Sequence, residues 1–131
     1  MKNFFLKLIA IWLLIITSDG YAKWEIIDHT TDGDDIYFES SSLKKNKQLV
    51  SIMFLGSFKS AKQTVDSDIY STKWYVEYDC HEKTSRILSR SFYADKMGQS
   101  KSLYTTDNAE QPVLIAPGTK DDYMWTIFCN K

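Results

Sequence analysis

Residues 71–93, STKWYVEYDCHEKTSRILSRSFY, contain the pattern that decides the fold. Over residues 71–82 the apolar and polar side chains alternate. One face carries Trp74, Val76, Tyr78 and Cys80. The other face carries Lys73, Tyr75, Glu77, Asp79 and His81. This alternation is typical of an antiparallel strand with one buried face. After a short link at residues 83–85, residues 86–94 alternate again, so the whole segment predicts a β-hairpin.

Further strands are predicted on both sides of this hairpin. They are expected at residues 24–28, 36–39, 48–58 and 102–106, with turns at 30–35 and 44–47 and a polar loop at 59–69. The run 48–58 is apolar on both faces, which indicates a central or doubly covered strand. We therefore expect an antiparallel sheet of about five to six strands.

The period changes near the C-terminus, where Pro117-Gly118 interrupts the chain. Thr119 then offers an N-cap, with Asp122 three residues later in a pattern resembling a capping box. Apolar side chains follow at helical spacing, namely Met124, Ile127 and Phe128. We expect one short C-terminal helix that packs on the face of Trp74, Val76 and Tyr78, which gives an α+β fold.

Cys80 and Cys129 are the only two cysteines of the 131 residues. In an oxidising compartment such a pair predicts one disulfide, here between the sheet and the helix. It would close a loop of about 49 residues, which contributes about 4 kcal/mol in the chain-entropy model. A zinc site or a catalytic Cys80–His81 pair is a weaker alternative, because neighbouring strand residues point to opposite faces.

The first 22 residues have the pattern of a secretory signal peptide. Lys2 and Lys7 supply positive charge, an apolar run covers residues 8–16, and Gly20-Tyr21-Ala22 provides small residues for cleavage. The apolar run is shorter than the roughly 20 residues that cross a bilayer, although an uncleaved anchor is the alternative. We therefore expect a signal peptide at 1–22 and a single domain at 23–131, without a transmembrane segment, in the periplasm or on the outer surface.

Composition excludes several classes of protein. Charged residues make up 25% and hydrophobic residues 44%, which are values of a globular chain rather than a disordered one. Lys and Arg number 16 against 17 Asp and Glu, so the net charge of −1 gives no electrostatic basis for nucleic-acid binding.

Candidate catalytic and metal-binding groups are few. An acidic turn could hold a divalent cation, with the residues Asp28, His29, Asp32, Asp34 and Asp35, but it lacks the spacing of a known calcium loop. Glu77, Asp79 and His81 could act as acids or bases, but no nucleophile accompanies them. Arg86 and Arg90 are expected to share one face, where they could clamp an acidic ligand or pair with Glu77 or Asp79. We predict neither catalytic residues, nor a metal site, nor a cofactor.

The chain resembles the surface-adhesin protein E family of exported Gram-negative proteins. The resemblance rests on ordered elements that span nearly the whole of 23–131: Tyr78-Asp79-Cys80, Leu88-Ser89, Met97-Gly98, Pro117-Gly118-Thr119 and Trp125 with Cys129. It implies a twisted antiparallel sheet, a C-terminal helix and a bridge between the two cysteines. It also implies adhesion to host matrix proteins. The sequence departs from the family pattern at Lys47, where a turn glycine is usual, and it has no cysteine at the expected mature start to carry a lipid.

These observations predict an exported, non-enzymatic, adhesin-like protein that binds host matrix or other envelope proteins, and a homodimer is left open. The alternative is a periplasmic module for a ligand such as a flat porphyrin, or an envelope accessory protein. The expected binding surface is the polar sheet face, with the residues Lys73, Tyr75, Glu77 and Tyr93.

Overall fold

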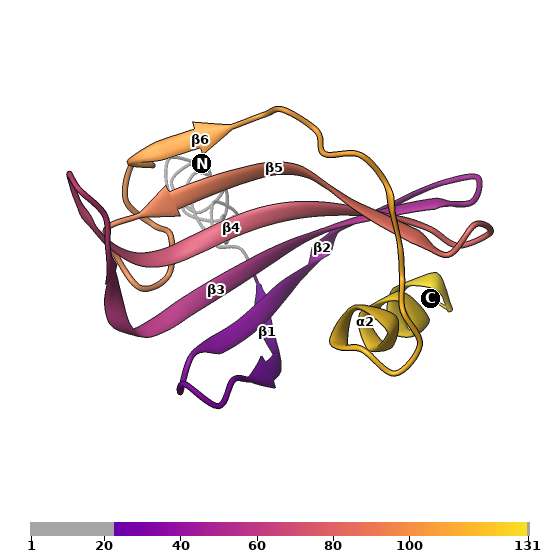
Figure 1. Ribbon diagram of the computed structural model, residues 1–131, viewed down its shortest axis with the longest axis horizontal. Helices are drawn as coiled ribbons and strands as arrows, with labels where there is room; N and C mark the ends of the chain where they lie inside the picture. Colours follow the sequence, from indigo (N-terminus) through magenta and orange to yellow (C-terminus); the bar gives the residue numbers. More distant parts are fainter. Residues whose placement is uncertain (1–22, 131) are drawn as a thin grey trace, which may run out of the picture.

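The computed structural model of the chain describes residues 23–130, and the predicted signal peptide lies outside these residues. One twisted antiparallel sheet has the strand order β1-β2-β3-β4-β5-β6, with β7 paired to β5 (Figure 1). Its strands are β1 (Trp24–His29), β2 (Asp35–Asn46), β3 (Leu49–Gln63), β4 (Asp68–Asp79), β5 (Thr84–Tyr93), β6 (Tyr104–Thr106) and β7 (Val113–Leu114). The helix α2 spans Lys120–Cys129. The expected α+β class is confirmed, and the sheet has seven strands where we expected five to six.

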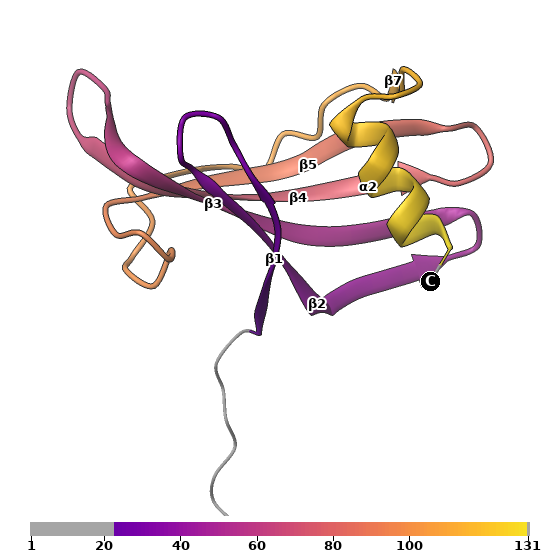
Figure 2. The ribbon, with the colours of Figure 1, turned by 90° about the horizontal axis from the view of Figure 1, so that it is seen from below.

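The helix lies against one face of the sheet only (Figure 2). We call the face that α2 covers the helix face and the opposite one the outer face. In Figure 2 the loop that follows β5 descends on the outer side, at the end of the sheet far from the helix. No helix among residues 23–130 has the length and apolar character needed to cross a membrane.

The predicted hairpin of residues 71–93 is present as β4 and β5, but the predicted link at residues 83–85 is wrong: the turn is at Cys80–Lys83, so Cys80 and His81 lie in it rather than in the strand. Its register contains one irregularity that alternation alone does not indicate. Tyr75 pairs with Ser89 but Val76 pairs with Ile87, so Leu88 is an extra residue in β5. Such a bulge shifts the alternation of side chains by one residue. On the helix face, odd-numbered side chains before Leu88 are therefore followed by even-numbered ones after it.

The predicted boundaries of β2 and β3 are wrong in two places. The expected turn at residues 44–47 is shorter, since β2 continues to Asn46 after an irregular stretch at residues 40–43. The expected loop at residues 59–69 is mostly strand, since β3 runs to Gln63 and β4 begins at Asp68. Extra residues in β3 interrupt its pairing with β4 between Ser57 and Lys62, which hides the strand from a simple alternation pattern.

The core lies between α2 and the centre of the sheet. Phe128 of the helix is fully buried, and the rings of three sheet residues surround it. Its ring centroid lies 5.2 Å from that of Phe38, 5.8 Å from that of Phe54 and 6.3 Å from that of Tyr78. Aromatic pairs at these separations stabilise a core beyond their buried area, so Phe128 is the main apolar anchor of α2.

Both ends of α2 are fixed as the sequence predicts. At its start the Thr119 hydroxyl accepts a hydrogen bond from the Asp122 amide at 3.1 Å, and the Asp122 carboxylate accepts one from the Gly118 amide at 2.9 Å. At its end Cys129 forms the expected disulfide with Cys80. The indole of Trp125 donates to the carbonyl oxygen of Asp79 at 3.0 Å, which adds a polar contact between helix and sheet.

Candidate functional site

The predicted binding surface lies on the outer face, and the structure divides its four residues into two groups. Lys73 and Tyr93 form the first group. The Lys73 ammonium lies 5.0 Å from the centre of the Tyr93 ring and 5.6 Å from that of Trp24. It also donates a hydrogen bond to the carbonyl oxygen of Gly98 at 2.9 Å. Lys73 is thus enclosed by protein groups, and its charge is stabilised by two aromatic faces.

The loop between β5 and β6 holds this enclosure in place. Asp95 accepts hydrogen bonds from the Gln99 amide at 2.8 Å and from the Ser100 hydroxyl at 2.5 Å. Burial alone would raise the pKa of Asp95, but these bonds and those from the amides of Met97 and Ser100 lower it to about 2. Gly98 has a φ of +60°, and a Cβ there would lie 2.6 Å from Cε of Lys73. Glycine is therefore favoured at this φ, and a larger residue would also displace the end of the Lys73 side chain.

Tyr75 and Glu77 form the second group, farther along β4. The Tyr75 hydroxyl lies 2.9 Å from the hydroxyl of Ser51 on β3. The Glu77 carboxylate accepts a hydrogen bond from Nε of Arg86 at 2.8 Å, which confirms one of the expected pairings. Tyr75 and Glu77 are half-buried and held by neighbouring strands, so this part of the outer face has a fixed arrangement before any partner binds.

Arg86 and Arg90 do not share a face, and the prediction that they do is wrong. The extra residue Leu88 lies between them and puts Arg86 opposite Glu77 on the outer face. Arg90 pairs with Trp74 on the helix face, and its guanidinium lies 3.4 Å from the carboxylate of Glu110. The two cations therefore cannot clamp one acidic ligand.

The groups considered for catalysis have separate local roles. The Asp79 carboxylate accepts hydrogen bonds from the amides of His81 and Glu82 at 3.0 and 2.9 Å, and so caps the turn between β4 and β5. The His81 side chain is 78% exposed, and its nearest charged partner is Glu82 at 3.8 Å. Among residues 23–130 the charged partner of Glu77 is Arg86 and not His81. This arrangement resembles a capped turn beside an ion pair rather than a catalytic cluster.

The acidic turn between β1 and β2 is also engaged locally. Asp34 is buried, and its carboxylate accepts a hydrogen bond from the Lys59 amide at 2.9 Å. Asp35 contacts Nδ1 of His29 at 2.6 Å, and Asp28 pairs with Lys120 of the helix at 2.7 Å. Within residues 23–130, no three His, Cys, Asp or Glu side chains converge as metal ligands do.

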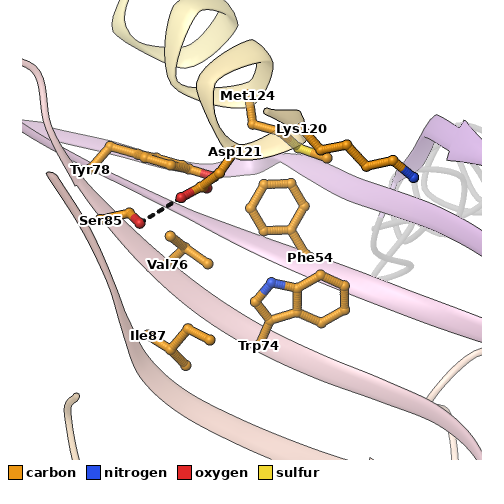
Figure 3. Close-up of a pocket in the computed structure, with 9 residues that line it drawn as sticks. All are labelled: Phe54, Trp74, Val76, Tyr78, Ser85, Ile87, Lys120, Asp121 and Met124. Carbon is orange, nitrogen blue, oxygen red and sulfur yellow. Dashed lines mark hydrogen bonds between the residues drawn. The ribbon is translucent and has the colours of Figure 1, made fainter. Parts of the chain in front are cut away.

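A cleft on the helix face was not predicted. It has a volume of about 310 Å³ and lies between the first half of α2 and strands β3, β4 and β5 (Figure 3). Its lining residues are Phe54, Trp74, Val76, Tyr78, Ser85, Ile87, Lys120, Asp121 and Met124. A sequence signal for it is the small residue Ser85, which pairs with Tyr78 on the helix face, because a short side chain there leaves space below the helix.

The polar end of this cleft is formed by Asp121 and Ser85. The Ser85 hydroxyl donates to Oδ2 of Asp121 at 2.7 Å, as Figure 3 shows. Burial raises the pKa of the Tyr78 hydroxyl strongly, and the charge and hydrogen bond of Asp121 raise it further. Tyr78 therefore stays a neutral hydroxyl beside the carboxylate.

Comparison with known proteins identifies the family. The profile of the family described as surface-adhesin protein E matches residues 24–130, which is nearly the whole described chain. The chain belongs to the surface-adhesin protein E family. The predicted resemblance is thus confirmed, and membership supports an adhesin-like surface protein.

Solved structures of Haemophilus influenzae protein E resemble this family member in fold. Its crystal form II aligns with a TM-score of 0.64 at 15% identity, covering 80% of this chain and 87% of that one. The structure of protein E from non-typeable Haemophilus influenzae aligns with a TM-score of 0.58 at 14% identity, covering 84% of this chain and 86% of that one. At such identities the likeness shows the fold alone. A search of curated proteins finds no match.

Proposed function

We propose that this surface-adhesin protein E family member is exported and non-enzymatic, and that it binds a protein partner through its outer face. The partner is a host matrix protein or another envelope protein. The observation that carries the proposal is the one-sided position of α2, which covers only one face of the sheet (Figure 2). The register of β4 puts Tyr75 and Glu77 on the opposite face, which no helix among residues 23–130 covers.

The chemistry of this surface suits a protein interface. Tyr75 offers an aromatic ring with a polar end, and tyrosine is enriched among the residues that dominate binding energy. Its hydroxyl is held by Ser51, and Glu77 is held by Arg86. Because these side chains are already ordered, binding costs less conformational entropy than it would with free ones. Lys73 and Tyr93 support the edge of the same surface under the loop after β5.

The non-enzymatic part of the proposal is supported by the separate roles of the acid–base groups. Glu77 pairs with Arg86, Asp79 caps a turn, and His81 is largely exposed to water. A catalytic site needs such groups around one concave position, with a defined place for the reacting atoms. Replacing His81 by Ala should therefore leave partner binding and the melting temperature unchanged.

Tyr75→Ala tests the proposed surface. Loss of a central tyrosine commonly costs at least 1–2 kcal/mol of binding, so we expect binding to a panel of immobilised matrix proteins to weaken about fivefold or more. The melting temperature should change little, since Tyr75 is only half-buried. Tyr123→Ala is the matched control, because this tyrosine is 60% exposed on α2, on the other side of the sheet.

The oligomeric mass of each variant should be measured alongside binding. If Tyr75→Ala converts a dimer to a monomer, the outer face is an interface between two copies rather than a partner site. If binding and melting temperature both stay unchanged, the face around Tyr75 is excluded as the contact surface.

A further inference from the structure

The cleft below α2 has an apolar body and one charged end. The ring of Trp74 lies 5.4 Å from that of Phe54, nearly parallel to it, and both rings line the cleft. Ile87 and Met124 extend this apolar lining, while Asp121 and Ser85 form its polar end (Figure 3). A volume of about 310 Å³ lies at the small end of the range for ligand sites, about 300–1,000 Å³.

The cations near this cleft are bound to other carboxylates. Lys120 lines the cleft with its alkyl chain, but its ammonium lies 2.7 Å from Asp28 and points away from the cleft in Figure 3. Lys83 pairs with Asp122 at 3.1 Å, and Arg90 pairs with Glu110 at 3.4 Å. Among residues 23–130 no Lys or Arg forms a salt bridge with Asp121.

The electrostatic potential at the polar end of the cleft is therefore negative. The N-terminus of a helix carries about half a positive charge, whereas the Asp121 carboxylate carries a full negative one. The partners of Asp121 are neutral hydroxyl groups, from Ser85 and Tyr78, which orient the charge without cancelling it. An anionic ligand would place a like charge beside Asp121, whereas an ammonium group would be attracted by this carboxylate while an apolar body packs against Trp74.

We propose that this cleft is a binding site for a small organic cation with an aromatic or alkyl body. The ammonium group binds at Asp121, and the apolar body lies against Trp74, Ile87 and Met124. The site is on the helix face, so it is separate from the proposed protein-binding surface around Tyr75, and either proposal can fail without the other.

The probe for this proposal is 2-phenylethylammonium, titrated into the isotopically labelled, disulfide-bonded protein and followed by NMR. For a fragment of this size we expect saturable binding with a Kd on the order of 1 mM. The shifted signals should be those of the Trp74 indole and of the amides of Ser85, Ile87 and Asp121. The anion 3-phenylpropionate, which has a similar body and the opposite charge, should bind at least about fivefold more weakly.

Asp121→Asn isolates the charge, because the amide oxygen can still accept the Ser85 hydrogen bond. This variant should bind 2-phenylethylammonium about fivefold more weakly and lose the preference over 3-phenylpropionate. Asp122→Asn is the matched control on the same helical turn. Its carboxylate contacts Lys83 and the Gly118 amide outside the cleft, so affinity for the probe should not change. Ile87→Phe is a second variant that fills the cleft and should abolish binding in a folded protein.

Three results would overturn the proposal. The first is equal affinity for the cation and the anion in the wild-type protein. The second is a set of shifted signals outside the cleft. The third is the absence of saturation at probe concentrations well above the expected Kd.

Discussion

The backbone at Lys47 has a φ of +56°, in the left-handed region that favours glycine. A non-glycine residue there costs roughly 1–2 kcal/mol, while glycine loses about 0.5–1 kcal/mol more conformational entropy on folding. We therefore expect Lys47→Gly to raise the free energy of unfolding by up to about 1 kcal/mol, measured by urea denaturation. Lys45→Gly is the control, since Lys45 lies in the extended strand β2 and its replacement should destabilise. Equal losses from both variants would contradict this account of the turn.

Asp95 makes the loop on the outer face sensitive to acid. Its pKa of about 2 in the folded protein lies below the ordinary value of 3.8. The stabilisation it provides is therefore complete above about pH 4 and is lost as the pH falls through about 2. NMR signals of Gln99 and Ser100 should report loop opening in that interval, and Asp95→Asn should remove the pH dependence. Loop signals that stay constant down to pH 1.5 (roughly half a unit below the folded pKa) would show that Asp95 does not control the loop.

At the scale of elements, α2 depends on one covalent and one apolar anchor, both near its C-terminal end. Replacing Cys80 and Cys129 together by Ser should lower the free energy of unfolding by about 2–5 kcal/mol, as is typical when a small exported domain loses its bridge. The measurement is chemical denaturation, with the reduced wild-type protein as a control that should behave alike. A variant as stable as the oxidised protein would show that Phe128 and its ring contacts suffice to hold the helix.

The sequence predicts best those elements whose side chains follow one period without interruption. Strand β4 and the capped helix α2 are predicted for this reason, whereas the extra residue Leu88 breaks the period within β5 and makes the predicted shared face of Arg86 and Arg90 wrong. The irregular stretches in β2 and β3 break the period, so strand at residues 59–63 was mistaken for loop. At the candidate site on the outer face, Lys73 contacts Trp24, which lies far from it in the sequence. Only the folded sheet brings the two residues together, so the sequence does not predict this contact. Asp121 could be recognised from sequence as a residue favoured at a helix start, but not as the end of a cleft.

At the scale of the whole molecule, the two cysteines and the predicted signal peptide point to the same route of export. We expect the protein purified from the envelope of a Gram-negative host to begin at Lys23 and to contain no free thiol. Intact-mass spectrometry with and without reduction tests both points, since reduction of one bridge adds about 2 Da (two hydrogens). Residues 1–22 retained on the purified protein would instead favour the uncleaved anchor, and two free thiols would contradict the oxidising route.

The extra residue Leu88 has a consequence for how this surface can evolve. On one side of it Ser85 and Ile87 face the helix, and on the other side Arg90 and Phe92 do. Deleting the codon of Leu88 would make Ile87 and Ser89 consecutive opposite Val76 and Tyr75, so the ladder would become regular and each side chain of β5 would keep its face. A deletion elsewhere in β5 would instead exchange the side chains that one flank presents to the two faces, and would alter the cleft or the outer surface. We therefore expect relatives with a shorter β5 to lack the residue at this position, and to differ elsewhere in the strand by substitution.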